Sequence, residues 1–144
     1  MVVTLFAAHG RPGADLTEEY RLAFGREILE SLANVPGFIS YNVYACLDDK
    51  TAWMGVVRWE SREAMLAWRE DKVHRAVFHR INEFYTDFNI QHTEVYREMF
   101  FREGQRLEPE SIEFYRERSI DFRKPPTFAD IYGQPMPEHQ SERT

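Results

Sequence analysis

His74 is the ionisable residue whose position best suits acid–base chemistry. It comes three residues before Val77 and four before Phe78, so it borders an apolar stripe on one helix face. An imidazole there can act as general base on a phenol or as a metal ligand, and Phe78 beside it is a candidate substrate contact. A structural histidine that bridges the helix to a sheet is the more common outcome for such a position. Both interpretations stay open at this point.

Two tryptophans are candidates for contact with a flat ring. Trp59 ends a predicted strand and shares one face with Trp53 and Val57, because side chains alternate along a strand. A buried tryptophan needs an acceptor for its indole N–H, so Trp59 is either a core residue or a substrate-stacking residue with a part in catalysis. Trp68, in the helix that follows, is predicted to help orient the substrate ring.

The remaining polar candidates lie on the first two predicted strands. Asn42 and Tyr44 share one face of the strand at 38–47, where they indicate a pocket wall or a wet dimer interface. His9 follows the inward alternation of the strand at 2–9 and is predicted to approach the mouth of the pocket. The histidines lack a recognised metal-ligand spacing, and the sequence contains no phosphate-binding or dinucleotide fingerprint. We therefore expect no bound metal and no NAD or FAD.

The composition excludes several classes of partner and location. The chain has 144 residues, 43% of them hydrophobic, which suffices for one domain with a core. Acidic residues outnumber basic ones by 24 to 18, whereas a nucleic-acid binder carries the opposite balance. No apolar run approaches the ~20 residues that span a bilayer, and residues 1–9 do not resemble a signal peptide. With Cys46 as the single cysteine, a cytoplasmic setting is expected.

The order of predicted elements indicates an α+β fold. The predicted strands cover residues 2–9, 38–47, 51–59 and 89–99, and the predicted helices cover 15–33 and 62–85 with a break at Asp71. A capping box at 15–18 and a cap at Ser61 mark the two helix starts. The order β-α-β-β-α-β is ferredoxin-like, an antiparallel sheet with both helices on one face. The other face is partly apolar, so we expect a second copy of the chain to cover it.

The last part of the chain is predicted to be an extension. Residues 1–101 form the domain, and residues 102–144 form a partly helical C-terminal extension with a loose end. A short helix is expected within 109–118. The aromatic side chains between 112 and 132 are too apolar to remain in water. The extension is therefore predicted to pack on the domain or on the dimer partner.

Several short motifs, in this order, resemble the antibiotic biosynthesis monooxygenase (ABM) family. They are Val-Pro-Gly-Phe-Ile-Ser at 35–40, Trp59-Glu60-Ser61 with Glu63-Ala64, Trp68-Arg69, and His74-Arg75. The likeness covers residues 2–98 and implies a dimeric α+β barrel in which two sheets face each other. The family includes cofactor-free oxygenases of phenolic polyketides, haem-degrading enzymes and proteins without a known role, so the resemblance alone does not select an activity.

At the candidate site the resemblance is partial. Trp59 stands where quinone-forming members keep a pocket tryptophan on the face toward the helices, and a histidine is frequent at the position of His74. An asparagine and a tyrosine of those enzymes are replaced here by Gly55 and Met65. The resemblance with these replacements implies a roomier and more apolar pocket, lined in part by Met65.

The function favoured by these residues is a cofactor-independent monooxygenase. A flat aromatic or phenolic substrate would bind between sheet and helices, His74 would remove a proton, and the electron-rich anion would react with O₂. One alternative is a haem-binding or haem-degrading protein, although residues 2–9 lack the asparagine that haem-degrading members use. The other alternative is a non-catalytic protein for small-molecule binding or assembly.

Overall fold

The chain is described by a computed structural model over residues 1–11, 26–49, 51–107 and 112–120. The strands are β1 (Val2–Gly10), β2 (Phe38–Ala45), β3 (Ala52–Trp59), β4 (Tyr85–Glu94), β5 (Phe100–Arg102) and β6 (Gln105–Leu107). The helices are α2 (Arg26–Ala33), α3 (Arg62–Arg69), α4 (Lys72–Phe78), the 3-10 turn η2 (Ile81–Glu83) and α5 (Ile112–Arg116). The predicted capping box at 15–18 and the aromatic residues beyond 120 lie outside the described residues.

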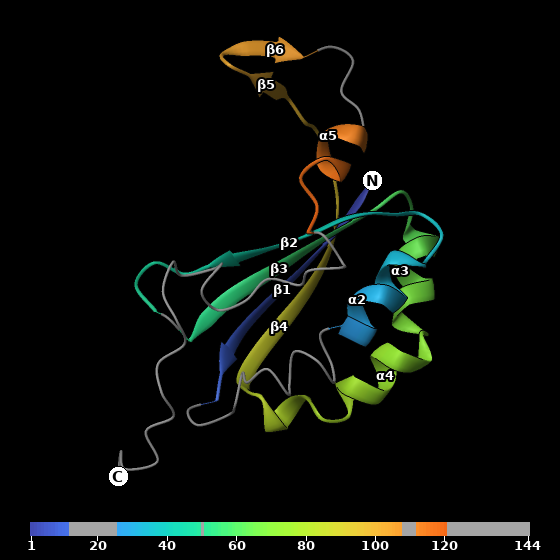
Figure 1. Cartoon of the computed structure of the whole chain (residues 1–144), viewed down its shortest axis with the longest axis vertical. Coiled ribbons are helices and arrows are strands. Elements are labelled where there is room, and N and C mark those ends of the chain that lie inside the picture. Colours follow the sequence, from blue (N-terminus) through green and yellow to red (C-terminus); the bar gives the residue numbers. More distant parts are fainter. Residues whose placement is uncertain (12–25, 50, 108–111, 121–144) are drawn as a thin grey trace.

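Strands β1 to β4 form one antiparallel sheet in the order β2-β3-β1-β4. Helices α2, α3 and α4 lie on one side of this sheet (Figure 1). The arrangement confirms the predicted ferredoxin-like α+β fold. The side toward these helices is called the helix face below, and the opposite side is called the open face. On β1 the helix face carries Val2, Thr4, Phe6 and Ala8, and the open face carries Val3, Leu5, Ala7 and His9.

The hydrophobic core lies between the helix face and the helices. Its buried side chains form one cluster drawn from β1, α2, the loop after α2, β3 and α3: Val2, Leu29, Leu32, Val35, Val57, Trp59, Ala64, Met65 and Trp68. Leu29 and Leu32 are three residues apart and so share one face of α2. Trp59 is at the centre of this packing, with none of its surface exposed.

A close approach between the loop before β2 and the start of α3 requires glycine at position 37. Gly37 has a φ of +91°, and a Cβ atom on it would lie 2.7 Å from the Cβ of Ala64. The Gly37 carbonyl accepts a hydrogen bond of 2.7 Å from the Glu60 N–H. The contact ties the start of β2 to the end of β3, just before the helix that carries Trp68.

Two side-chain caps divide the helical segment after β3, as predicted. Ser61 accepts a hydrogen bond from the Ala64 N–H at 3.2 Å and begins α3. Asp71 accepts one from the His74 N–H at 3.0 Å and begins α4. The Ser31 hydroxyl donates to the other Asp71 oxygen at 2.8 Å, which links α2 to the start of α4.

The boundary between the last helix and β4 differs from the prediction. The helix expected to reach residue 85 ends at Phe78, and η2 follows. β4 begins at Tyr85 because Tyr85 already pairs with Gly10, and it ends at Glu94 because Val2 is its last partner on β1. Partners on the neighbouring strand, which helical periodicity does not reveal, therefore set both ends.

The β5–β6 hairpin was not predicted from the sequence. Its two-residue turn has positive φ at both central residues, 52° at Glu103 and 77° at Gly104. Positive φ at both positions is the mark of a type I′ turn, which matches the twist of a hairpin. The hairpin stands away from the four-stranded sheet (Figure 1).

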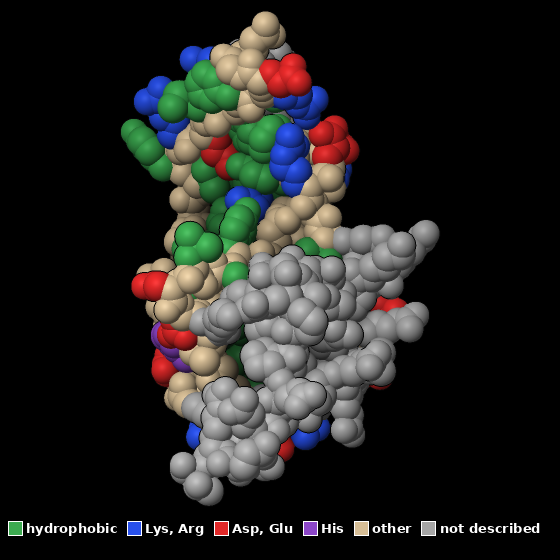
Figure 2. Space-filling view, turned by 60° about the vertical axis from the view of Figure 1, so that its left-hand side comes forward, with side chains coloured by type: hydrophobic (Ala, Val, Ile, Leu, Met, Phe, Trp, Pro, Cys, Tyr) green, Lys and Arg blue, Asp and Glu red, His purple; other side chains and the backbone are tan. Residues whose placement is uncertain are grey.

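Helix α5 lies within the segment predicted to be helical and packs against the residue that opens β5. The buried Phe100 ring contacts Phe114 at 4.6 Å and Tyr115 at 5.4 Å between centroids. The Tyr115 hydroxyl donates to Glu98, and Arg58 lies 4.1 Å from the centre of the Tyr115 ring. Burial, with Glu98 adding to it, raises the pKa of Tyr115 to about 12. Figure 2 shows hydrophobic side chains interspersed with charged ones on this part of the molecule.

The residues after α5 attach to the edge strand β2. The Ile120 N–H donates to the Tyr41 carbonyl at 2.9 Å, and the Tyr41 N–H donates to the Ser119 hydroxyl at 3.0 Å. The Asn42 side-chain amide donates to the Arg118 carbonyl at 2.6 Å. These bonds occupy backbone groups that an edge strand would otherwise leave open to pairing with another chain.

Candidate active site

The structure sorts the predicted site residues onto opposite sides of the sheet. The helix side holds Trp59, Met65, Trp68, His74 and Phe78. The open face holds His9, Asn42 and Tyr44. The first set forms one connected group of side chains, and the second set is separated from it by the thickness of the sheet.

A bulge in β2 explains why the faces of this strand were hard to assign from the sequence. Phe38 pairs with Trp59 but Ser40 pairs with Arg58, so the register shifts between Phe38 and Ser40. Phe38 therefore packs against the core, edge-on to Trp59 at 6.0 Å, although simple alternation placed it with Ser40 and Asn42. Beyond the bulge, the alternation resumes and places Asn42 and Tyr44 on the open face.

Trp59 is held by a hydrogen-bond chain that runs from the buried indole toward the surface. Its indole N–H donates to the Thr4 hydroxyl at 3.1 Å, and that hydroxyl lies 2.9 Å from His92 Nδ1. The Thr4 hydroxyl accepts from Trp59 and keeps both a proton and a second lone pair, so it can pair with either tautomer of His92. Burial, and then the charge of Arg69, lowers the pKa of His92, which agrees with a neutral ring. Sequence reasoning missed Thr4 and did not choose His92 as a site residue, because only the strand register brings the two together.

The His74 ring lies flat on Trp68. The ring centroids are 4.2 Å apart with an angle of 18° between the planes, and His74 Nδ1 lies 3.3 Å from the Trp68 carbonyl oxygen. A carbonyl can only accept, so Nδ1 carries the proton, and in the neutral ring Nε2 carries the lone pair. Burial lowers the pKa of His74, so the neutral, basic form is favoured near pH 7.

The helix cap fixes the backbone beneath His74. Burial raises the pKa of Asp71, but hydrogen bonds from the His74 N–H and the Ser31 hydroxyl outweigh it and leave that pKa below its usual value. Asp71 therefore stays ionised and holds the first turn of α4 against α2. The same carboxylate favours the protonated His74 ring, although less than burial disfavours it.

A row of aromatic rings continues from His74 along the helix face. Phe78 lies 6.3 Å from His74 and 5.8 Å from Phe88, and Phe88 stacks on Phe6 at 5.7 Å with planes 17° apart. Phe6 in turn lies 5.5 Å from Trp53. Flat, apolar walls of this kind suit an aromatic ligand, because rings stack or meet edge to face at such distances.

The space above Gly55 is filled, which corrects the expectation of a roomier pocket there. A Cβ atom on Gly55 would lie 3.0 Å from Tyr41 Cε2 and 3.3 Å from Trp53 Cζ3. Met65 is buried in the core rather than beside an open space. Glycine at position 55 therefore allows the rings of Tyr41 and Trp53 to lie directly on β3, instead of leaving a cavity.

The open face carries a hollow at the end of the sheet where His9 lies. It has a volume of about 400 Å³ and is lined by Ala7, Ala8, His9, Tyr44, Ala45, Cys46, Ala52, Trp53, Met54, Asp87, Phe88 and Asn89. Asn42 is not among the lining residues; it pairs with Val56, further along the sheet, and its amide is bonded to the extension. Within the described part of the chain, no group of three or more His, Cys, Asp or Glu side chains is arranged to hold a metal ion.

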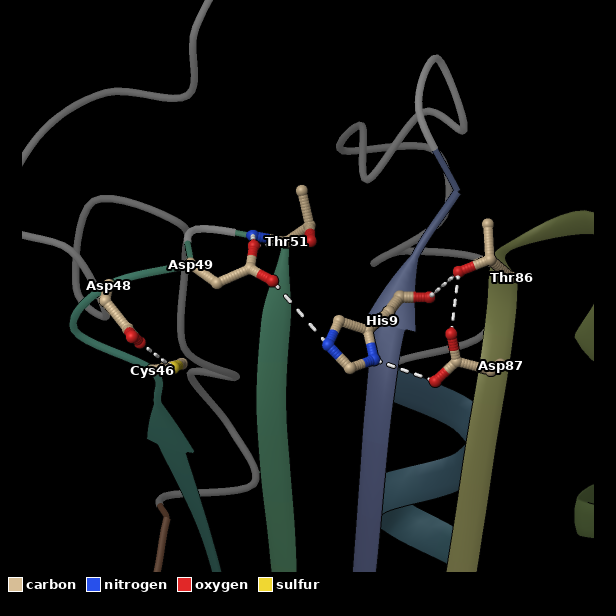
Figure 3. Close-up of polar contacts among 7 residues, drawn as sticks. All are labelled: His9, Cys46, Asp48, Asp49, Thr51, Thr86 and Asp87. Carbon is tan, nitrogen blue, oxygen red and sulfur yellow. Dashed lines mark hydrogen bonds and ion pairs between the residues drawn. The ribbon is translucent and has the colours of Figure 1, made fainter.

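At the rim of this hollow His9 lies between two carboxylates, as Figure 3 shows. Its Nδ1 is 2.7 Å from Asp87 Oδ1, and its Nε2 is 3.6 Å from Asp49 Oδ2. The hydrogen bond and the charge of Asp87 raise the pKa of His9. Sequence reasoning found His9 but not Asp87, since 78 residues separate them in the chain.

Comparison with known proteins assigns the chain to a family. The sequence profile described as "antibiotic biosynthesis monooxygenase" matches residues 1–80, more than half of the chain. The chain belongs to the ABM family. No curated protein sequence matches it significantly. Among its described residues no helix is long and apolar enough to cross a membrane.

Solved structures agree with this ABM assignment at the level of the fold. One, described as an antibiotic biosynthesis monooxygenase, superimposes with a TM-score of 0.56 at 16% identity, covering 67% of this chain and 100% of its own. A Mycobacterium tuberculosis protein gives a TM-score of 0.57 at 18% identity, covering 67% and 96%. A conserved protein of Methanosarcina mazei gives 0.53 at 14% identity, covering 64% and 89%. At such identities the likeness concerns the fold alone.

Proposed function

We propose that this ABM-family protein is a cofactor-independent monooxygenase that oxidises a flat aromatic or phenolic small molecule on the helix side of the sheet. The observation that carries the proposal is the geometry of His74. Its ring is stacked on Trp68, its Nδ1–H is directed to a backbone carbonyl, and its Nε2 is left as the basic atom. Family membership supports a monooxygenase in general, and the aromatic row from Phe78 to Trp53 supports an aromatic substrate.

The proposed reaction needs no cofactor, because the substrate supplies the electrons. With an anthrone as substrate, His74 Nε2 takes the acidic proton and leaves an electron-rich anion. That anion reacts with O₂: one oxygen atom becomes the new quinone carbonyl and the other leaves as water, with the two hydrogens of the oxidised carbon. Keeping the imidazole neutral before the substrate binds is the contribution of burial at His74.

The working unit in this proposal is a cytoplasmic homodimer. Proteins of the ABM family are typically dimeric, and the open face of the sheet has partly exposed apolar side chains that a second copy would cover. Two sheets facing each other would complete the α+β barrel expected from the sequence. Size-exclusion chromatography with light scattering tests this part of the proposal independently of any activity.

Oxygen uptake with an anthrone or a dihydroxynaphthalene, measured with an oxygen electrode, tests the reaction. We expect His74→Gln to lower the rate by about 100-fold or more, because glutamine cannot take the proton. His79→Gln is the matched control, since His79 is an exposed residue at the end of the same helix. Absence of uptake by the unaltered protein across the substrate panel would overturn the proposal. A haemin titration that shifts the Soret band only when His74 is present would favour the haem alternative instead.

A further inference from the structure

The hollow on the open face has a floor of small side chains. Ala7 of β1 and Ala52 of β3 lie on the two central strands, where each contributes only a methyl group. Longer side chains rise around them on three strands, from Tyr44 on β2, Met54 on β3 and Asn89 on β4. The volume of about 400 Å³ falls within the range of small-molecule sites, which are mostly apolar with a few polar groups.

One rim of the hollow carries an arranged acid–base pair. Asp87 Oδ1 accepts the His9 Nδ1–H at 2.7 Å, and the Thr86 hydroxyl donates to Asp87 Oδ2 at 3.2 Å. A carboxylate on Nδ1 fixes the tautomer, so Nε2 is the nitrogen that receives a proton. The partners come from β1 and β4, and Asp49 approaches Nε2 from the turn before β3. An exposed ion pair stabilises a fold little, so stability does not explain why this group borders a cavity.

We propose that this hollow is a second ligand site of the chain, which binds a small phenol with its ring over Ala7 and Ala52 and its hydroxyl donating to His9 Nε2. The apolar floor and the Tyr44 ring match an aromatic ring. The carboxylates of Asp49 and Asp87 disfavour an anionic carboxylate or phosphate ligand, whereas a neutral hydroxyl donor meets acceptors only. In the proposed dimer a second copy would face this hollow and enclose it.

The site lies on the opposite side of the sheet from His74, so it does not rest on the proposed oxygenase reaction. Trp68 on α3 and His74 on α4 lie on the helix side, and neither lines the hollow. Trp53 and Phe88 of the aromatic row do line it, so the variants that separate the two sites are those of His9 and His74. Because His9 and His74 lie on opposite sides of the sheet, the two sites can be altered separately. A phenol bound in the hollow would also be adjacent to the thiol of Cys46, whose Sγ donates to Asp48 at 2.8 Å.

Binding of phenol to the full chain, followed by isothermal titration calorimetry at a pH where the ligand is neutral, tests the proposal. We expect His9→Gln to weaken binding by about tenfold, because it removes the ring nitrogen that accepts from the phenol hydroxyl. Ala52→Leu should abolish binding by filling the floor. Asp87→Asn retains an oxygen acceptor for Nδ1–H, so it should weaken binding less than His9→Gln does, and it tests the same pair with a small change.

Two controls decide the outcome. His79→Gln, an exposed histidine elsewhere, should leave the binding curve unchanged, and circular dichroism verifies the fold of each variant. The proposal would be overturned if the unaltered chain showed no binding up to millimolar phenol. It would also be overturned if the His9→Gln and Ala52→Leu variants bound phenol as tightly as the unaltered chain does. Loss of the signal in His74→Gln with retention in His9→Gln would place the phenol on the helix face and would also overturn it, while leaving the oxygenase proposal intact.

Discussion

The two faces of this sheet shift the pKa values of their histidines in opposite directions. On the helix side His74 lies flat on Trp68, and burial lowers its pKa. On the open side His9 is exposed beside Asp87, and the carboxylate raises its pKa. The comparison teaches that the surroundings of a histidine can shift its pKa in either direction.

The faces also differ in how their space is used. On the helix face large rings fill the volume, and glycine at position 55 admits the rings of Tyr41 and Trp53. On the open face alanines at positions 7 and 52 leave a hollow. A ligand on the helix face must therefore displace or slide between rings, whereas a ligand on the open face enters space that already exists.

Trp59→Ala is the change with the largest expected effect on this contrast. The Trp59 side chain is fully buried, and its indole N–H donates to the Thr4 hydroxyl. Its loss therefore leaves a large cavity and removes one bond from the hydrogen-bond chain. We expect a loss of about 3 to 5 kcal/mol in the free energy of unfolding, measured by urea denaturation. Met54→Ala, on the same strand but on the open face, is the matched control and should cost less than about 1 kcal/mol. Equal losses of unfolding free energy in the two variants would contradict a core that lies on the helix face of the sheet.

Gly55→Ala has a smaller expected effect. The added Cβ would lie 3.0 Å from the Tyr41 ring, and overpacking costs about 1 to 3 kcal/mol, against a gain of about 0.5 to 1 kcal/mol from a less flexible unfolded chain. The net expectation is a loss of about 1 to 2 kcal/mol. In the double variant with Tyr41→Leu, part of this loss should disappear, and additive losses would mean that the two side chains do not meet.

Much of the fold was predictable because it is encoded locally. The strand alternation of β1 and β3, the cap at Ser61 and the re-cap at Asp71 each involve neighbours in sequence. The end of α4 and the start of β4 were not predictable in this way, because the pairing of Tyr85 with Gly10 sets them. The bulge at Phe38 and Ser40 likewise depends on how β2 meets β3.

The candidate site shows the same division between local and distant information. His74 and Phe78 are one helical turn apart, so their proximity could be predicted from spacing. The separation of His9 from His74 could not, because it depends on which face of β1 the helices cover. Asp87 became a partner of His9 only through the strand register. Sequence reasoning thus proposed one site where the structure has two groups of residues.

The smallest expected effect is on proton binding, and it tests the comparison most directly. By NMR titration we expect His9 to have a pKa above the reference value of 6.5 and His74 to have one below it. Asp87→Asn should lower the pKa of His9 toward 6.5 and leave that of His74 unchanged, because the main cause of the His9 shift is its bond to Asp87. His74→Gln is the reciprocal control and should leave the His9 titration as it is.

These opposite shifts predict opposite effects of pH on stability. The unfolded chain binds a proton at His74 more readily than the folded chain, so the contribution of His74 rises with pH in the window just below 6.5. The folded chain holds the His9 proton more tightly, so its contribution is complete below 6.5 and is lost as pH rises through the folded pKa. The stability difference between the unaltered chain and His74→Gln should therefore change on the acid side of 6.5, and the difference for His9→Gln on the alkaline side. If the contributions of His74 and His9 to stability changed with pH in the same direction, one of the two histidines would not have the surroundings described for it.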